Sequence, residues 1–330
     1  MKVFVAGGSG AIGRHLVPML VARGHSVVAT THTPQNTGTI ASMGAQPVVV
    51  DGLDEAATVR AVVAASPDAI IHEMTSLAGF NDFRKFAKAF ETTNRLRTEG
   101  LDYLIEGAKQ AGTRRIIAQS YSGLTNPRSG SWIKTEADGL DPDPLPAAAG
   151  MLSSVRYLER RLGEVPGIEG FALRYGGLYG PHTSLSADGE IVELLKKRRF
   201  PIIGGGSAVW SFVHVADAAS ATVAALTRGE PGVYNVVDDE PARVSEWLPY
   251  LAEVVGAPKP WRLPAWVGRL AGGKLAVTMM TELRGSSNAK AKRELGWLPE
   301  HRSWHEGFRE VAVEPNIEQI SEMAPRQRAS

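Results

Sequence analysis

Residues 2–13 of the chain read KVFVAGGSGAIG, a short apolar run followed by a loop rich in glycine. Gly7, Gly10 and Gly13 are spaced G-x-x-G-x-x-G, and the residues that follow have the apolar periodicity of a helix. Glycines at this spacing let the backbone turn tightly and bring amide groups close to a pyrophosphate, which the helix N-terminus also stabilises. The stretch therefore predicts a strand, a phosphate-binding loop and a helix, the opening of a dinucleotide-binding fold.

Short β-branched runs alternate with longer helical patterns through the first half of the chain. The runs expected to form strands are KVFVAG, HSVVATT, AQPVVVD, DAIIHEM, RRIIAQS and GFALRYG. Buried strands separated by crossover helices are typical of a parallel sheet that is covered on both faces. We therefore predict an α/β fold built on a doubly wound Rossmann sheet.

The pattern becomes less regular after about residue 175, where turns rich in glycine and proline and the segment PKPWRLPAW follow. Strand and helix patterns return at SFVHVADAAS and GVYNVVD. We expect residues 1–175 plus about 208–240 to form an NAD(P)-binding Rossmann domain. A smaller C-terminal substrate-binding portion is expected from about 176–207 plus 241–330.

The composition limits the function classes open to this chain. Its 330 residues carry 36 basic and 35 acidic side chains, a balance that gives no indication of nucleic acid or membrane partners. The absence of cysteine excludes disulfides, thiolate catalysis and zinc–sulfur sites. The apolar stretch after Met1 is too short for a signal peptide or a membrane span. We expect a soluble cytoplasmic protein with a small-molecule substrate.

The end of the second strand bears on the choice of nicotinamide cofactor. NAD sites favour an acidic residue there, whereas this chain has Thr31 and His32, whose hydroxyl and imidazole groups suit a 2′-phosphate. NADP is therefore favoured, NAD is the alternative, and both residues could instead belong to a loop that does not touch the nucleotide. Asp51 is placed to meet the adenine. The expected cofactor contacts are Gly7, Gly10, Ala11, Ile12, Gly13, Thr31, His32, Asp51, Gly52 and Met74.

Taken in order, these motifs resemble the extended short-chain dehydrogenase/reductase family, the NAD(P)-dependent epimerase/dehydratase group. The resemblance covers nearly the whole chain and rests on GGSGAIG, PDAIIHE, RRIIAQS, LRYGGLYGP, FVHVADAA, GVYNVVDDEP and NAKAKRELGWLP. It implies a Rossmann domain, a C-terminal substrate domain and a site between them. It also implies a dimer built from two helices of each subunit, so a homodimer is expected.

The family further implies a catalytic Tyr-x-x-x-Lys on the helix after the fifth strand, with an acid four residues beyond the lysine. Tyr157 and Arg161 resemble that pair, but only 13 residues separate Arg161 from Arg174 at the end of the next strand. Aligning Glu159 with the acid leaves 19 residues from position 155 to Arg174, which suits the rest of a helix, a loop and a strand. The pair then falls on Met151 and Val155.

Helical geometry favours this second alignment. At about 100° per residue, Met151, Val155, Leu158 and Leu162 share one apolar face that would turn inward. Tyr157 lies away from that face, beside Arg161. We therefore expect Tyr157 and Arg161 to form a surface or subunit-interface pair and the chain to lack the Tyr-x-x-x-Lys pair.

Another proton donor is then needed, and the end of the fifth strand, IIAQSYSG, offers one. Family members carry a hydroxyl residue in this segment that hydrogen-bonds the substrate oxygen. We hypothesise that Tyr121 is the catalytic acid or base, assisted by Ser120 or Ser122. In the competing interpretation, Tyr121 only lines the site.

The segment AVWSFVHV indicates the kind of substrate. Members that act on nucleotide sugars carry an arginine two residues before the aromatic residue, where it binds a diphosphate, and Trp210 stands there in this chain. An indole cannot bind a diphosphate in that way, so a largely apolar or aromatic substrate is favoured. The expected lining residues are Met151, Val155, Leu178, Trp210, Met279 and Met280, although each could equally belong to the core.

Three functions remain open on the sequence alone. The favoured one is an atypical oxidoreductase that passes a hydride between NADP(H) and a carbonyl or activated double bond of a small apolar metabolite. The alternatives are an epimerase or dehydratase that keeps its nicotinamide, and a noncatalytic NAD(P)-binding sensor or scaffold. His301 and His305 share a helical spacing, but no third ligand is evident and we expect no metal.

Overall fold

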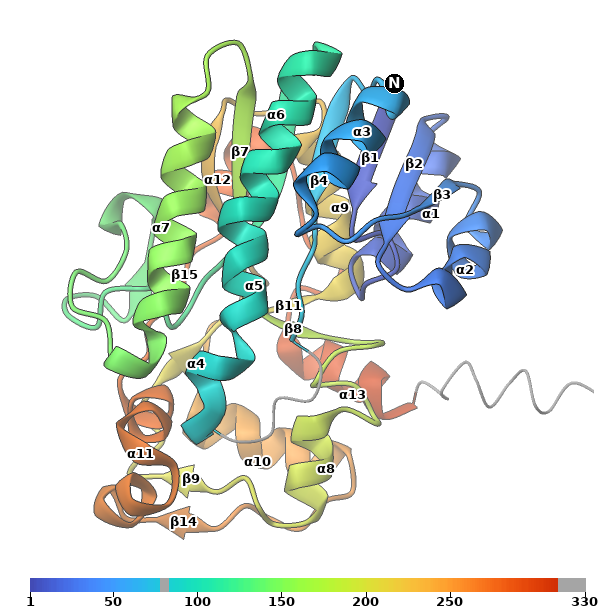
Figure 1. Ribbon diagram of the computed structural model, residues 1–330. Helices are drawn as coiled ribbons and strands as arrows, with labels where there is room; N and C mark the ends of the chain where they lie inside the picture. Colours follow the sequence, from blue (N-terminus) through green and yellow to red (C-terminus); the bar gives the residue numbers. More distant parts are fainter. Residues whose placement is uncertain (78–82, 314–330) are drawn as a thin grey trace, which may run out of the picture.

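A seven-stranded parallel sheet forms the upper part of the molecule in Figure 1. The computed structural model describes residues 1–77 and 83–313. The strand order is β12-β7-β5-β4-β1-β2-β3, and every described pairing in this sheet is parallel. The strands are β1 Lys2–Ala6, β2 Ser26–Thr31, β3 Gln46–Val49, β4 Ala69–His72, β5 Arg115–Tyr121, β7 Glu169–Tyr175 and β12 Gly232–Val236. The predicted doubly wound α/β sheet is confirmed.

Helices cover both faces of this sheet because successive strand residues point to opposite sides and both sets are apolar. One face packs against α1 Gly13–Ala22, α2 Thr37–Ser42 and α9 Val215–Ala225. The other packs against α3 Glu55–Ala65, α6 Leu101–Ala111 and α7 Ala149–Glu164. Two separate apolar cores result, one on each side of the strands.

The chain reverses its direction across the sheet at β1. It runs from β1 outward through β2 to β3, then crosses back to β4 on the other side of β1. In open α/β sheets, ligands bind beyond the carboxyl ends of the strands at such a reversal. The glycine-rich loop that follows β1 lies at this point.

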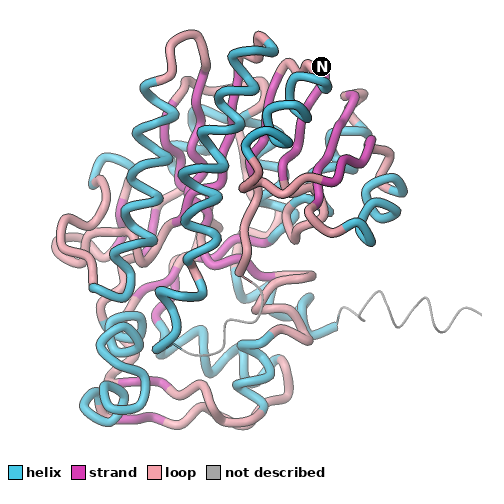
Figure 2. The backbone as a smooth tube through the Cα atoms, viewed as in Figure 1, coloured by secondary structure: helices cyan, strands magenta, loops and turns pink. Residues whose placement is uncertain are grey.

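A third apolar core lies below the sheet, where shorter elements gather (Figures 1 and 2). Its helices are α4 Phe86–Ala89, α8 Glu190–Lys196, α10 Val244–Val254, α11 Ala265–Thr281 and α13 Trp304–Val313. Its short strands pair as β8 Gly177–Tyr179 with β11 Phe212–His214, β9 Ile202–Ile203 with β14 Arg262–Leu263, and β10 Val209–Trp210 with β13 Ala242–Arg243. A further pair joins β6 Ile133–Lys134 to β15 Gly285–Ser286.

The division into a Rossmann domain and a substrate-binding portion stays a prediction. The lower core also includes residues of the predicted Rossmann ranges, among them Phe86, Leu145 and Phe212. Helix α12, Ala289–Leu295, lies in the later range and yet packs on the sheet, where Ala291 and Leu295 join the same core as α9. The predicted range also runs into residues 314–330, which lie outside the described part. Within residues 1–77 and 83–313, no helix has the length and hydropathy needed to cross a membrane.

Candidate functional site

The glycine-rich loop has the conformation that phosphate binding requires. Gly7 has φ of 94°, a left-handed conformation that favours glycine, and a Cβ there would lie 2.8 Å from the Glu73 carbonyl. A Cβ on Gly13 would lie 2.5 Å from the carbonyl oxygen of Gly8. Glycine at both positions is therefore a steric requirement of the loop.

The loop leaves backbone donors free at the N-terminus of α1. Arg14 N donates to Gly10 O and Leu16 N to Ile12 O, so the helical hydrogen bonds begin beyond the loop. Among the described residues, the amides of Ala11, Ile12 and Gly13 have no acceptor within the protein. Three free amides at a helix N-terminus fit a pyrophosphate, whose charge the helix dipole also stabilises. The residues present therefore fit a dinucleotide at this loop.

A cation that the sequence interpretation missed lies at the same loop. Arg14 Nε donates to the carbonyl of Ser9 at 3.1 Å, and Ser9 Oγ donates to Thr31 Oγ1 at 3.0 Å. These contacts bring the first turn of α1 beside the end of β2. Thr31 itself is buried and accepts from Thr33 N, whereas the His32 ring is exposed and contacts the Thr33 hydroxyl.

The residues after β3 and β4 close the other side of the loop. Asp51 is exposed and its Oδ1 accepts from Leu53 N, while a Cβ on Gly52 would lie 2.4 Å from the sulfur of Met74. His72 Nδ1 accepts from Met74 N and its Nε2 bonds to Leu96 O, and burial lowers the pKa of His72 to about 4. A neutral His72 therefore holds the turn at which Met74 approaches Gly52.

Glu159 on α7 fixes that helix against the strands. Both of its carboxylate oxygens accept from Arg174 on β7, from Nε and Nη2, each at 2.6 Å. Ser120 Oγ on β5 donates to the same carboxylate at 2.8 Å. Glu159 therefore joins α7 to both β5 and β7, whereas its alignment with the acid of the family stays a prediction.

The face of α7 that turns inward is apolar, as the helical geometry predicted. Met151 and Val155 are both buried, at 1% and 0% exposed. Tyr157 and Arg161 lie on the other side, where both bond to the carboxylate of Asp102 on α6. Burial and then Asp102 raise the pKa of Tyr157, the opposite of what an activated proton donor needs.

Tyr121 ends β5 and is partly buried at the boundary of the lower core. Its hydroxyl has no hydrogen-bond partner among residues 1–77 and 83–313. Ser120 already donates to Glu159, and Ser122 is buried against the hydroxyl of Ser286. Of the three predicted catalytic residues, Tyr121 alone keeps an uncommitted hydroxyl; the assisting roles of Ser120 and Ser122 stay predictions.

Arg97 is the second residue that the sequence interpretation missed. It lies in a π-helical turn, Leu96–Gly100, and is only 2% exposed. Burial raises the pKa of the Tyr121 hydroxyl, and the positive charge of Arg97 opposes that rise. Arg97 follows Arg95 by two residues, and nothing in the sequence indicates which of the two is buried.

Most of the expected substrate-lining residues gather in the lower core. Met151, Met279 and Met280 are buried there, and Trp210 and Tyr121 pack against the same cluster with part of their surface exposed. Trp210 Nε1 donates to Met279 O at 2.8 Å, and its ring lies 5.1 Å from that of Trp247. Leu178 packs instead against the core of the sheet. Lining of a substrate by these residues stays a prediction.

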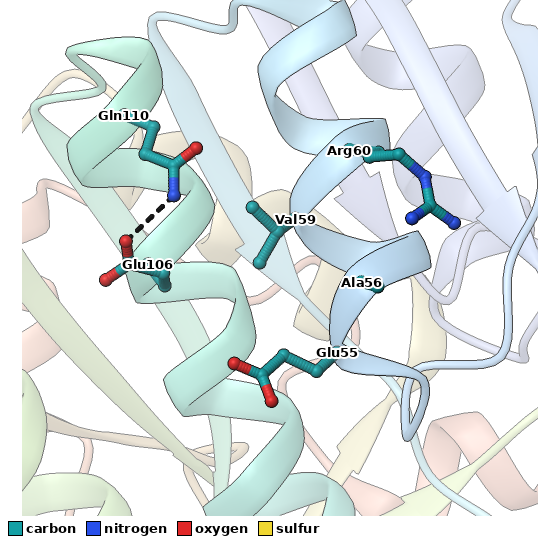
Figure 3. Close-up of a pocket in the computed structure, with 6 residues that line it drawn as sticks. All are labelled: Glu55, Ala56, Val59, Arg60, Glu106 and Gln110. Atoms are coloured by element: carbon teal, nitrogen blue, oxygen red, sulfur yellow. Dashed lines mark hydrogen bonds between the residues drawn. The ribbon is translucent and has the colours of Figure 1, made fainter.

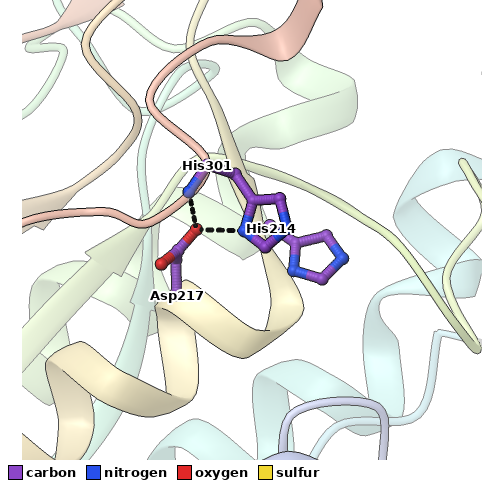
Figure 4. Close-up of side chains that lie close together, drawn as sticks. All are labelled: His214, Asp217 and His301. Carbon is purple, nitrogen blue, oxygen red and sulfur yellow. Dashed lines mark hydrogen bonds and ion pairs between the residues drawn. The ribbon is translucent and has the colours of Figure 1, made fainter. Parts of the chain in front are cut away.

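A cluster of potential metal ligands lies apart from these residues, at the start of α9 (Figure 4). Asp217 accepts from the backbone of Glu300 and His301 and from His301 Nδ1 at 2.7 Å. His214 Nδ1 accepts from Ala216 N, and His301 Nε2 bonds to Glu310. Because these groups are engaged with one another, the cluster ties the segment before α13 to α9, and we assign no metal to it.

A surface depression of about 490 Å³ lies between α3 and α6 (Figure 3). Glu106 and Gln110 face it from α6 and are hydrogen-bonded to each other, and Glu55 and Val59 face it from α3. It contains none of the predicted site residues. The geometry therefore points to the carboxyl edge of the sheet, from the glycine loop to Tyr121, as the candidate active site.

Known proteins share both this fold and this length. A model of the NAD dependent epimerase/dehydratase family matches residues 3–236. A 3-diazoavenalumate denitrifying reductase from a Streptomyces species is 39% identical over 308 residues, which is 93% of this chain and 99% of the relative. A 4-hydroxy-2-methyl-3-oxo-4-farnesyl-3,4-dihydroquinoline-1-oxide ketoreductase from Stigmatella aurantiaca is 26% identical, over 90% of this chain and 92% of the relative.

A solved structure is similar over almost its whole length. The UDP-glucose 4-epimerase of Thermus thermophilus in complex with NAD has a TM-score of 0.72 and 25% identity, and the match covers 94% of this chain and 98% of the epimerase. Together with the glycine loop and its free amides, these findings define an enzyme that uses a nicotinamide cofactor. The chain belongs to the NAD dependent epimerase/dehydratase family, within the extended short-chain dehydrogenase/reductases.

Proposed function

We propose that the chain is an NADPH-dependent reductase that acts on a small, largely apolar or aromatic acid. The observation that carries the proposal is the full-length similarity to the Streptomyces denitrifying reductase, at 39% identity. The aromatic and apolar boundary formed by Tyr121 and Trp210 supports an apolar substrate. The phosphate loop would hold the dinucleotide, which supplies a hydride when it is bound in the reduced form.

The preference for NADPH rests on Arg14 together with Thr31 and His32. The end of β2 carries no acid that would select a ribose hydroxyl. The contacts Arg14–Ser9–Thr31 bring a guanidinium to the side of the loop where an adenosine 2′-phosphate would lie. Guanidinium groups bind phosphate through paired N–H donors, so this arrangement favours the phosphorylated cofactor.

We further infer that this chain works without the Tyr-x-x-x-Lys pair. The Glu159–Arg174 contact supports the alignment that puts Met151 and Val155 at those positions. Neither side chain can donate a proton or hold a ribose. An epimerase or dehydratase begins by oxidising an alcohol, and these two positions offer no base for that step.

Replacing a diazo group by hydride is a reaction that suits such a site. Hydride addition to the carbon of an arenediazonium forms one C–H bond, breaks the C–N bond and releases dinitrogen, so electrons and charge balance. Because the leaving group departs as a neutral gas, the step requires no proton donor. We therefore propose a diazo-bearing aromatic acid as the substrate class, in which the protein orients the ring and excludes water.

Reduction of a carbonyl is the second candidate, because the uncommitted hydroxyl of Tyr121 could protonate an alkoxide. The similarity to the Stigmatella ketoreductase, at 26% identity, favours it to a lesser degree. The test is to supply NADPH with arenediazonium acids and, separately, with aryl ketones, and to measure cofactor oxidation and dinitrogen release. Release of dinitrogen in step with NADPH oxidation supports the proposal. Turnover of ketones alone overturns it, and binding of NADPH without any turnover supports a sensor.

A further inference from the structure

The candidate site holds a buried positive charge that no carboxylate of residues 1–77 and 83–313 neutralises. Arg97 is 2% exposed, and its Nε and Nη1 have no hydrogen-bond partner in the described part of the chain. No ion pair with a described carboxylate involves it. Burial lowers the pKa of the Arg97 guanidinium to about 10, so it remains charged at neutral pH. A buried charge without a partner costs several kcal/mol by order of magnitude, which makes a purely structural role for Arg97 a poor explanation.

The neighbouring helix places this charge within the site. Asn94 accepts from Ser154 Oγ on α7 at 3.0 Å, and eight residues later Asp102 accepts from Arg161 Nε at 2.8 Å. Arg97 lies between these two contacts, level with the turn of α7 that contains Val155. The charge of Arg97 acts on the pKa of the neutral Tyr121 hydroxyl at the end of β5 and on the pKa of the His72 ring at the end of β4, so both groups lie near it. Arg97 therefore faces the carboxyl edge of the sheet.

We propose that Arg97 is an anion-binding subsite for the substrate, where its guanidinium binds an anionic oxygen, either a carboxylate or a phenolate, beside the Tyr121 hydroxyl. This inference rests on the proposed function, because it names how the reductase would recognise an acid. A guanidinium presents paired donors that match such an oxyanion in a bidentate contact. The bound anion would supply the partner that the protein lacks.

The position favours the substrate over the phosphates of the cofactor. The glycine loop follows β1, whereas Tyr121 ends β5, and β4 lies between these two strands. Neighbouring strands are about 4.8 Å apart, so this subsite lies roughly 10 Å to the side of the phosphate loop. Arg14, at the loop itself, is the cation suited to the cofactor.

The test compares Arg97→Met with Arg95→Met, in the full chain saturated with NADP⁺. Arg95 is the matched control because it lies two residues before Arg97, is exposed and is paired with Glu99. Isothermal titration uses cinnamate as a carboxylate, 4-nitrophenolate as a phenolate, and cinnamyl alcohol and 4-nitroanisole as neutral probes. Arg97→Met is expected to weaken binding of at least one anion by about tenfold or more, and to leave both neutral probes and NADP⁺ unchanged. Arg95→Met is expected to change none of them.

The same variant has a readout that needs no ligand. Without substrate, removal of the unpaired charge should raise the melting temperature of Arg97→Met above that of the wild type. If the affinity of Arg97→Met for both anions is unchanged, the subsite is overturned. It is also overturned if the variant loses affinity for NADP⁺ and not for the anions. If Arg97→Met does not fold, titration of the wild-type protein tests the proposal instead. Equal affinity of the wild-type protein for cinnamate and cinnamyl alcohol overturns it. These titrations involve no turnover, so an inactive protein that binds acids through Arg97 refutes the reductase and retains the subsite.

Discussion

Glu159 and Arg174 join α7 to β7 through two hydrogen bonds of 2.6 Å, with side chains only 8% and 3% exposed. The same carboxylate accepts from Ser120 on β5. One buried ion pair therefore sets the rotation of α7 against two neighbouring strands. That rotation buries Met151 in the lower core and Val155 beside it on the inward face, and it leaves Tyr157 with Asp102 on α6.

Substitution of Glu159 by Gln tests this contact. The change keeps the size of the side chain but leaves Arg174 buried with no opposite charge, so we expect a loss of about 3–5 kcal/mol in the free energy of unfolding. Urea denaturation measures it. Glu99→Gln, in the exposed Arg95–Glu99 pair, is the control and should cost no more than about 1 kcal/mol. Equal losses in the two variants would mean that the buried pair does not organise α7.

The glycine loop predicts a graded response to alanine. At Gly13 a Cβ would lie 2.5 Å from Gly8 O, whereas at Gly10 it would lie 3.4 Å from Gly7 O. Gly13→Ala should therefore weaken NADPH binding by about 100-fold or abolish it, because the loop must move to fit the methyl group. Gly10→Ala should weaken it far less. Fluorescence titration with NADPH checks both, and a reversed order would be inconsistent with this loop geometry.

Much of the fold follows from local sequence patterns. Continuous apolar runs such as VFVA and AIIH form strands buried on both faces, and the helical runs between them cover those faces. The 19 residues from position 155 to Arg174 hold the rest of α7, a loop and β7, as predicted, because these elements need a minimum length of chain. The alignment of positions 151 and 155 with the Tyr-x-x-x-Lys pair stays a prediction. The glycine spacing placed the phosphate loop for the same kind of reason, since its backbone geometry is set locally.

The parts of the site that depend on long-range contacts were beyond the sequence. Arg95 and Arg97 lie in the same run, and a π-helical turn decides that Arg97 is buried while Arg95 pairs with Glu99. The cofactor-binding role proposed for Arg14 depends on the contacts of Ser9 with both Arg14 and Thr31, which join the loop to the end of β2. The sequence does not distinguish the hydroxyls of Ser120 and Ser122 from that of Tyr121, because their partners Glu159 and Ser286 lie far away along the chain.

Arg14 should discriminate between the two nicotinamide cofactors. Replacement by Met removes the cation beside Thr31, so binding of NADPH should weaken by about tenfold or more while binding of NADH changes little. Dissociation constants for both cofactors measure the effect. Arg23→Met, at the far end of α1, serves as a control. If Arg14→Met weakens NADPH and NADH equally, Arg14 supports the loop and does not select the 2′-phosphate.

Glu73 should make the stability of the protein depend on pH. Burial raises the pKa of Glu73 to about 8, against an ordinary value of 4.5, and Tyr175 contacts its carboxyl at 2.9 Å. Between these values the folded state holds a proton that the unfolded state has released, so stability falls as pH rises. Glu73→Gln keeps a neutral polar group and should flatten this dependence. At pH 9 it should be more stable than the wild type, by on the order of 3 kcal/mol.

Denaturant titrations from pH 5 to pH 9 check the Glu73 prediction. The two proteins should have similar stability near pH 5, where the carboxyl is protonated in the folded state, and diverge as the pH rises. Parallel curves at every pH would show that Glu73 is not held in its neutral form.

Tyr121→Phe separates the two candidate reactions. Reduction of a ketone needs a proton at the product oxygen, so that activity should fall by about 100-fold without the hydroxyl. Release of dinitrogen from a diazo acid needs no proton, so its kcat should fall less than tenfold, although KM can rise. Steady-state kinetics on both substrates give the comparison. Equal loss of both activities would assign Tyr121 a role in orienting either substrate.

In the proposed reaction, NADPH delivers a hydride directly to the carbon that loses its diazo group. The most direct measurement uses NADPH labelled with deuterium at either face of C4, an arenediazonium acid, and mass spectrometry of the product. We expect one of the two labelled cofactors to give a product with one deuterium at the former diazo carbon, together with one equivalent of dinitrogen. A product that takes its hydrogen from solvent, or NADPH that stays unoxidised while bound, would contradict the proposed reaction.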